Sequence, residues 1–247
     1  TVFRALPQAE KHHNHVFYNP KILLESRSIF NRQKLRGRRR LAKRLEGGDI
    51  MDLVIKPLTP DLTQDYLDYF DKRAFSPTDT NGPCYCTSPT QTSEEIDKMV
   101  REFAGDVKGT IRRYAVQMLN EGKIQGYLAF DGGSAIGWCN AADKNTYAKN
   151  RYQFVPDFTR ETVAGKTMSV VCFSVAPAYR GQGVSAALLD RVVADAKAEG
   201  YCFVEGYAHI RKEKYDTDFK GPVGLYEKAG FERVAEQNGV VIMRKTL

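Results

Sequence analysis

The stretch VVCFSVAPAYRGQGVSAALLDRVVADAKAEGY, residues 170–201, decides the fold of this chain. It opens with an almost wholly apolar run, which predicts a strand buried on both faces of a sheet. Pro177 follows, and the apolar spacing then changes to that of an amphipathic helix over residues 184–199. Gly181 and Gly183 stand at the junction between the two. The pattern therefore predicts a strand and a helix joined by a loop built around glycine.

The glycine loop is suited to binding an anion. The first turn of a helix carries backbone N–H groups without intrahelical partners and a partial positive charge. Glycine lets a ligand approach these amides closely, and Arg180 adds a fixed positive charge. A pyrophosphate site is one interpretation, and an ordinary tight turn is the other, because a lone Gly-x-Gly is weak evidence. The dinucleotide fingerprint and the P-loop are not met, since residue 186 is Ala and no Gly-Lys-Ser/Thr follows.

Strand and helix patterns are interspersed from Met51 to the C-terminus. The predicted strands cover 53–58, 127–130, 135–140, 168–175, 202–208 and two C-terminal segments joined at Asn238-Gly239. The predicted helices cover 61–75, 93–121, 184–199 and 222–229. Residues 143–167 are polar and irregular, which predicts a surface excursion. This order predicts a mixed α/β fold with a single core.

The charge of the chain is unevenly distributed. The net charge is +7, and residues 1–50 hold 12 Lys and Arg against 4 Asp and Glu, so the remainder is nearly neutral. We therefore predict a basic N-terminal extension over 1–50 and one folded domain over 51–247. Blocks of like charge are usually solvated, which predicts a flexible extension. A basic amphipathic helix that binds nucleic acid, an anionic membrane or an acidic partner is the alternative.

The composition narrows the class of protein. No apolar run reaches the roughly 18 residues of a membrane span, and the first residues show no secretory pattern. Five cysteines, an odd number, lie mostly in apolar stretches, which predicts reduced thiols and a cytoplasmic location. The histidines at 12, 13 and 15 have no Cys or acidic residue at ligand spacing, so no metal site is predicted. The oligomeric state, monomer or homodimer, stays open.

Two motifs resemble one known family. RGQGVS, residues 180–185, is similar to the R/Q-x-x-G-x-G/A motif of the GNAT superfamily of N-acetyltransferases, and FSVAPAY, 173–179, resembles the strand and proline before it. GLYEKAGFERV, 224–234, resembles the downstream helix that carries Leu-Tyr and ends at Gly-Phe. Both occur in order and at the family's separation, and the resemblance covers residues 51–247. It implies a mixed, mostly antiparallel central sheet, flanked by helices and splayed between its two central strands.

The resemblance implies an enzyme, an acetyl-CoA-dependent N-acetyltransferase, in which an amine attacks the thioester directly. A small primary amine is the predicted acceptor. A protein lysine or N-terminus, or a CoA-binding regulatory module without turnover, are the alternatives. Backbone groups of Phe173 and Val175 are expected to pair with the pantetheine arm. The residues expected to hold the pyrophosphate are Arg180, Gly181, Gln182, Gly183, Val184, Ser185 and Ala186.

The resemblance also places catalytic groups. Tyr226 falls where many members have the general acid, and a phenol with a pKa near 10 suits protonation of a departing thiolate; packing is the alternative role. Many members have Asn and Ala where this chain has Phe219 and Pro222, so this helix starts differently. Glu205, a charged residue in an apolar strand beside the expected gap, is the predicted base or substrate anchor, and simple exposure on an edge is the alternative. His209 and a water relay remain open as bases.

The acceptor side is expected in the loop that contains Cys84-Tyr85-Cys86. Tyr85 and Cys86 are predicted to form a wall of the acceptor pocket, together with Trp138 and Asn140 of a nearby strand. A core aromatic residue and a strand-end cap are the alternatives for the last two. The role of Cys84 and Cys86 stays open, because a disulfide between residues two apart is strained and no further zinc ligands lie nearby.

Overall fold

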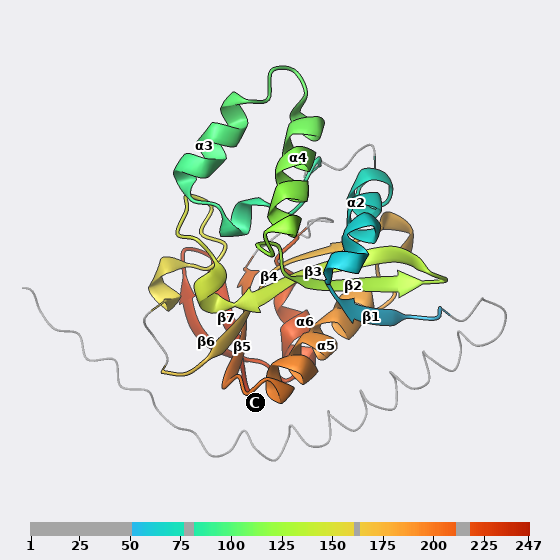
Figure 1. The fold of residues 1–247 in the computed structure, drawn as a ribbon. Helices are drawn as coiled ribbons and strands as arrows, with labels where there is room; N and C mark the ends of the chain where they lie inside the picture. The colour runs from blue at the N-terminus through green and yellow to red at the C-terminus, as the bar shows by residue number, and fades with distance from the viewer. Residues whose placement is uncertain (1–50, 77–81, 161–163, 211–217) are drawn as a thin grey trace, which may run out of the picture. The chain divides into compact units, whose positions relative to one another are not determined.

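A computed structural model describes residues 51–76, 82–160, 164–210 and 218–247 of the chain (Figure 1). Residues 1–50 lie outside the described residues, so the basic extension and its boundary with the folded domain remain predictions. The described strands are β1 (Val54–Pro57), β2 (Gly126–Asp131), β3 (Ser134–Asp143), β4 (Thr167–Val175), β5 (Phe203–His209), β6 (Glu232–Gln237) and β7 (Val240–Thr246). The described α-helices are α2 (Thr63–Lys72), α3 (Ser93–Arg101), α4 (Val107–Asn120), α5 (Val184–Ala198) and α6 (Val223–Lys228).

The strands form a seven-stranded mixed sheet in the order β1-β2-β3-β4-β5-β7-β6. β4 and β5 are parallel, and every other neighbouring pair is antiparallel. This confirms the predicted mixed, mostly antiparallel sheet. The β2–β3 hairpin turns at Gly132-Gly133, where both residues have positive φ, as a tight turn between twisted strands requires.

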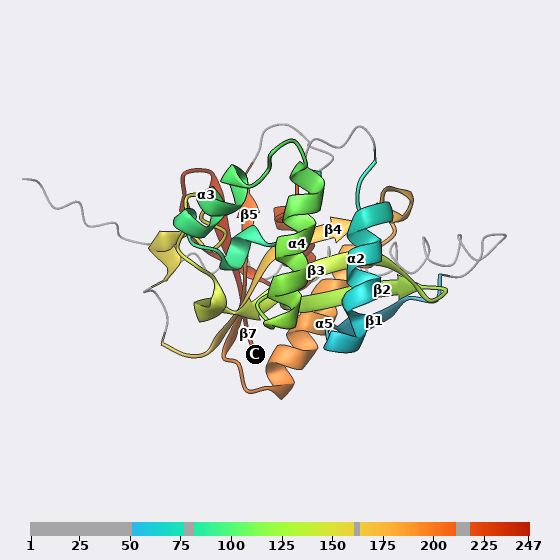
Figure 2. The same ribbon diagram turned by 45° about the horizontal axis from the view of Figure 1, so that its top comes forward.

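Helices cover both faces of the sheet. α2 and α4 lie side by side over the β2–β3 part of one face, as Figures 1 and 2 show. α5 and α6 pack on the opposite face, where Leu188, Leu189 and Tyr226 join side chains of β3, β4 and β5 in a core. The amphipathic spacing of the helices therefore determines the layers, because each helix buries one apolar stripe against the sheet.

Residues 143–160 differ from the predicted surface excursion. They contain two 3₁₀ turns, Lys144–Thr146 and Asp157–Thr159, and cover a third core on β4, β5 and β7 with Tyr147 and Val155 fully or almost fully buried. Arg160 donates hydrogen bonds to the carbonyls of Tyr147 and Ala148. A few apolar residues and these backbone hydrogen bonds pack the segment against the sheet. Neither feature produces a periodic pattern in the sequence.

The two central strands separate along their length. β4 and β5 pair only over Thr167–Val170 and Phe203–Gly206, although both strands continue. A β-bulge makes Val171 the extra residue against β3, since Asn140 pairs with Cys172 and Ala141 with Val170. The predicted splay therefore lies between the C-terminal halves of β4 and β5, directly before the glycine loop.

Candidate functional site

The glycine loop lies at the N-terminus of α5. Gly181 and Gly183 have φ of 73° and 92°, in the left-handed region that favours glycine, and Gly183 is the N-cap residue of the helix. A Cβ at either position would have no other atom within 4 Å, so the space above both backbones is open. The first intrahelical bond runs from the Ala187 N–H to the Gly183 carbonyl, at 3.0 Å. The amides before Ala187 are therefore available to an anion.

A cavity of about 660 Å³ opens in front of this loop. Its walls come from the end of β4, the start of α5, residues 218–225 and the cysteine loop at 84–86, with Phe70, Phe75 and Phe154 adding aromatic surface. Arg180 lines the cavity, and its Nε donates to the Val175 carbonyl at 3.1 Å. The glycine loop and the adjoining end of β4 lie far from the cysteine loop in sequence, yet all of them line one cavity.

The edge of β4 that faces the split is partly occupied. The Phe173 N–H donates to the Phe219 carbonyl at 2.6 Å. Alternate residues of a strand direct their N–H groups to the same side, so the Val175 N–H faces that side as well. The expectation that both Phe173 and Val175 offer backbone groups to a pantetheine arm therefore changes. Phe219 already pairs with Phe173, and Val175 is the position left for an extended ligand.

Tyr226 lies under the split rather than in the cavity wall. Its side chain is fully buried against Phe173 and Phe231, and its hydroxyl donates to the Lys220 carbonyl at 2.8 Å. Gly206 makes room for the ring, because a Cβ on Gly206 would lie 2.2 Å from it. Burial raises the pKa of Tyr226 well above its usual value, so the phenol stays protonated.

Residues 218–220 place one polar side chain in the cavity wall and bury another beside it. Asp218 lines it, and its Oδ1 lies 3.2 Å from Nδ1 of His209. Lys220 is almost fully buried, and its Nζ is 3.5 Å from the Gln153 carbonyl. Burial lowers the pKa of Lys220 to about 8, and the neighbouring Asp218 and Cys172 oppose this shift. The sequence shows no periodic signal for this group, which follows a charged loop.

The cysteine loop is anchored by the tyrosine at its centre. Tyr85 is fully buried among aromatic residues below α2, and its hydroxyl hydrogen-bonds to Asp71. Its carbonyl accepts a hydrogen bond from Tyr66 at 2.7 Å. Tyr85 and Trp138 were both predicted to form the pocket wall. They belong instead to the core between α2 and the sheet, and they do not line the cavity. Their aromatic surface packs the sheet against α2.

Cys86 lines the cavity, and a residue of the sheet contacts its sulfur from behind. Its sulfur accepts a hydrogen bond from Nδ2 of Asn140 at 3.3 Å, and Oδ1 of Asn140 accepts one from the Tyr147 hydroxyl at 2.7 Å. Asn140 does not reach the cavity itself. It orients its amide behind the cysteine, so its contribution to the site acts through Cys86. Nothing in the sequence links Tyr147 to this pair.

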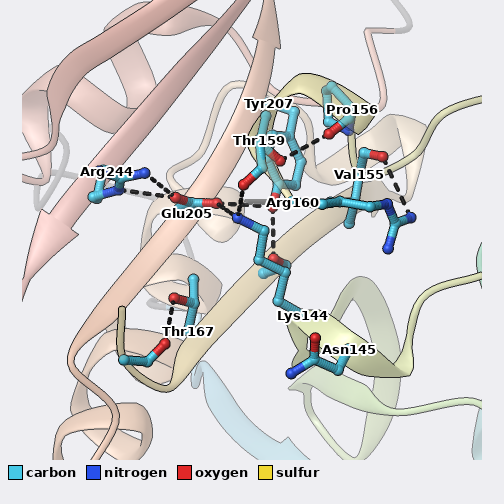
Figure 3. A network of polar contacts seen from close by, with 12 residues as sticks. Lys144, Asn145, Val155, Pro156, Thr159, Arg160, Thr167, Glu205, Tyr207 and Arg244 are labelled. Carbon is cyan, nitrogen blue, oxygen red and sulfur yellow. Dashed lines mark hydrogen bonds and ion pairs between the residues drawn. The ribbon is translucent and has the colours of Figure 1, made fainter. Parts of the chain in front are cut away.

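Glu205 lies in a different environment, drawn in Figure 3. Its carboxylate is fully buried, 2.9 Å from Nζ of Lys144 and 2.6 Å from the guanidinium of Arg244. The Tyr207 hydroxyl donates to it as well, and Lys144 donates to the Thr159 carbonyl. Glu205 does not line the cavity. A carboxylate with two cations in contact is stabilised in its charged form and shut off from an incoming amine.

Neither a metal cluster nor a membrane-spanning helix occurs among the described residues. No group of three or more His, Cys, Asp or Glu side chains is placed to hold a metal ion there. No helix among those residues is long and apolar enough to cross a bilayer.

Part of the chain matches one known protein family model. Residues 122–233 match the family model described as an acetyltransferase (GNAT) domain. These residues include the split strands, the glycine loop and Tyr226. Among curated proteins, the comparison found no significant match.

Several solved structures of acetyltransferases are similar to this chain at low identity. One is PaiA N-acetyltransferase from Thermoplasma acidophilum in complex with coenzyme A, 16% identical, with a TM-score of 0.43, covering 80% of this chain and 100% of that one. A GNAT-family acetyltransferase from Listeria monocytogenes is 12% identical, with a TM-score of 0.47 and coverage of 79% and 95%. A ribosomal-protein-alanine N-acetyltransferase from Brucella melitensis is 14% identical, with a TM-score of 0.40 and coverage of 78% and 99%.

Proposed function

We propose that this protein transfers an acetyl group from acetyl-CoA to a primary amine. The proposal starts from the match of residues 122–233 to the GNAT acetyltransferase domain model. The observation that carries the proposal is the open glycine loop at the start of α5, which lines the same cavity as the end of the split strand β4. A pyrophosphate needs converging amides and close backbone approach, and both are available there.

The residues present fit a CoA thioester as substrate. Amides of Gly181 to Ala186 would bind the pyrophosphate, and Arg180 at the rim would add charge. Val175 would pair with the pantetheine arm. The thioester supplies an activated acyl carbon, and the cavity beyond the split, about 660 Å³ in all, leaves space for the acceptor.

Direct attack by the amine requires a base and an acid. For the base we propose Asp218 with His209, because Asp218 lines the cavity and touches the imidazole, whereas Glu205 is buried and doubly ion-paired. For the acid we propose Tyr226, which burial keeps protonated and which lies under the split, outside the cavity wall. Its hydroxyl would exchange the Lys220 carbonyl for the departing thiolate.

The proposed acceptor is a small amine with an apolar body. The cavity wall presents Phe70, Phe75 and Pro89 as well as Phe154, which packs against Phe219. Such side chains favour burial of an apolar group, and Asp218 across the cavity suits the amine.

Calorimetric titration of the full chain with acetyl-CoA and with CoA tests the binding step. Wild-type protein is expected to bind both, and Gly183→Trp is expected to bind neither, because the indole would fill the open space above the loop. Gly200→Trp is the matched control. Gly200 has a similar φ of 74° and open space, but it lies at the other end of α5, away from the cavity. Retained affinity in Gly183→Trp would overturn the assignment.

The contact between Phe219 and Phe173 supports a second candidate, a CoA-binding module without turnover, because it occupies an edge that a substrate would use. Thiol release in a screen of small apolar amines separates the two. In an active enzyme, Tyr226→Phe is expected to lower kcat by roughly 10²–10⁴-fold with little change in CoA affinity. Binding with no thiol release for any amine would favour the module.

A further inference from the structure

Cys86 is held in an unusual backbone conformation at the cavity wall. Its φ is 52°, in the left-handed region that non-glycine residues rarely adopt, and such residues gather at functional sites. The buried Tyr85 next to it fixes the loop from behind through its contacts with Tyr66 and Asp71. The loop therefore presents the Cys86 sulfur to the cavity while the neighbouring ring points into the core.

Hydrogen-bond donors converge on the Cys86 sulfur. Nδ2 of Asn140 donates to it at 3.3 Å, and Tyr147 orients that amide. Cys172, which also lines the cavity, lies beside this sulfur and favours its charged form. The indole N–H of the fully buried Trp138 has no hydrogen bond of ordinary geometry within the described residues, yet it lies close enough to Cys86 to favour its charged form. A buried cysteine used only for packing needs none of these donors.

The donors distinguish Cys86 from the other two thiols of the cluster. The thiol of Cys172, the nearby indole of Trp138 and the amide of Asn140 together outweigh burial and lower the pKa of Cys86. In contrast, burial raises the pKa of Cys84 to about 12, and the hydrogen bond to Cys86 raises that of Cys172 well above its usual value. The thiolate is the reactive form of cysteine, so one of the three thiols is prepared for nucleophilic attack.

We propose that Cys86 is a second acyl acceptor of this protein and takes the acyl group of a bound acyl-CoA when no amine occupies the cavity. This inference rests on the proposed function for the donor. The Cys86 sulfur forms a bond to the acyl carbon, the carbon–sulfur bond to CoA breaks, and the departing CoA thiolate takes up the proton that Cys86 gave to solvent. No oxidation or reduction occurs. One thioester replaces another, so the transfer is reversible and excess CoA returns the acyl group.

Mass spectrometry of the intact full chain tests this. Wild-type protein incubated with acetyl-CoA, without amine, is expected to gain one acetyl group. The group is expected on the peptide that contains Cys86, to be cleaved by neutral hydroxylamine and to be lost on adding excess CoA. An amide on lysine resists hydroxylamine. Cys86→Ala is expected to lose the adduct, whereas Cys202→Ala, which removes an exposed cysteine outside the cavity wall, keeps it.

The wild-type experiment is decisive even if Cys86→Ala fails to fold, since the peptide map locates the adduct without a variant. Binding of acetyl-CoA in the calorimeter with no acetyl group on Cys86 would overturn this inference and leave the proposed function standing. A small thioester, S-acetyl-N-acetylcysteamine, serves as a second donor. Acetylation of Cys86 by it in protein that does not bind acetyl-CoA would keep the acceptor and reject the CoA site. No adduct from either donor would reject the acceptor.

Discussion

Two buried polar clusters, one around Glu205 and one around Cys86, differ in how their charges are compensated. Glu205 has Lys144 and Arg244 in direct contact and is closed off from the cavity. Cys86 has only neutral donors, and it opens on the cavity. A buried charge with full partners is stabilised and inert, whereas a partly stabilised anion beside open space keeps its reactivity. The comparison assigns a structural role to the first cluster and a chemical one to the second.

The largest effect is expected from Glu205→Gln. The change leaves Lys144 and Arg244 as buried cations without their carboxylate, which costs about 3–5 kcal/mol of unfolding free energy. Denaturant titration measures this loss. Asp97→Asn is the control, because it removes a half-exposed partner of Arg151 and costs about 1 kcal/mol or less.

The same variant tests whether Glu205 is the catalytic base that the sequence predicted. Folded Glu205→Gln protein is expected to keep its kcat at a temperature well below its unfolding transition. A large fall in kcat with a normal denaturation midpoint would contradict the comparison and return Glu205 to the role of base.

A smaller effect is expected from Lys220→Met, which removes a buried cation that lies beside one carboxylate and one thiol. Lys220 has a lowered pKa of about 8 in the folded protein, against 10.5 for the free side chain. Between these values the unfolded chain binds the proton and the folded protein does not, so wild-type stability rises with pH in this range.

At pH 7 the wild-type protein carries the full cost of burying the charge, so Lys220→Met is expected to be more stable by roughly 1–3 kcal/mol. The difference is expected to shrink as the pH approaches 10. Thermal or urea unfolding of both proteins across this pH range measures it. Lys228→Met, which changes an exposed lysine of α6, controls for the lost charge and is expected to show no such trend. A difference independent of pH would show that Lys220 is not deprotonated in this range.

The smallest effect is expected from Asn140→Leu, which removes one donor from Cys86. The pKa of Cys86 should rise, so the midpoint of its reaction with iodoacetamide moves to higher pH and its rate at pH 7 falls by about tenfold for each unit. Asn145→Leu, which changes an exposed asparagine on the following turn, is the matched control. An unchanged pH profile in Asn140→Leu would mean that the amide does not stabilise the thiolate.

Local patterns predicted most of the fold. The change from an apolar run to helical spacing around Gly181 and Gly183 located β4, α5 and the loop between them, because periodicity and glycine placement act over a few residues. The segment after Asp143 was predicted as a surface excursion, and the structure shows it covering a core. Its buried residues, such as Tyr147 and Val155, are too sparse to form a period.

The candidate site was less predictable. The glycine loop lies where its residues were expected to line a cavity, since its conformation depends on those residues themselves. Tyr85, Trp138, Asn140, Glu205 and Tyr226 are chemically plausible site residues, but all five are buried and none lines the cavity. Side-chain direction in a strand or loop depends on register and on distant partners, and Glu205 has its partners 61 and 39 residues away.

The sequence by itself determined the order of strands and helices, the glycine loop at the start of α5 and the resemblance of both motifs to GNAT proteins. These depend on spacing and on backbone freedom, which neighbouring residues set. Only the tertiary structure decided which titratable groups meet. It paired Glu205 with two cations and placed the Phe219 carbonyl on the open edge of β4, at the Phe173 N–H. It also brought Asn140 and Cys172 to Cys86. A group's charge and reactivity depend on burial and on partners that folding brings from far along the chain.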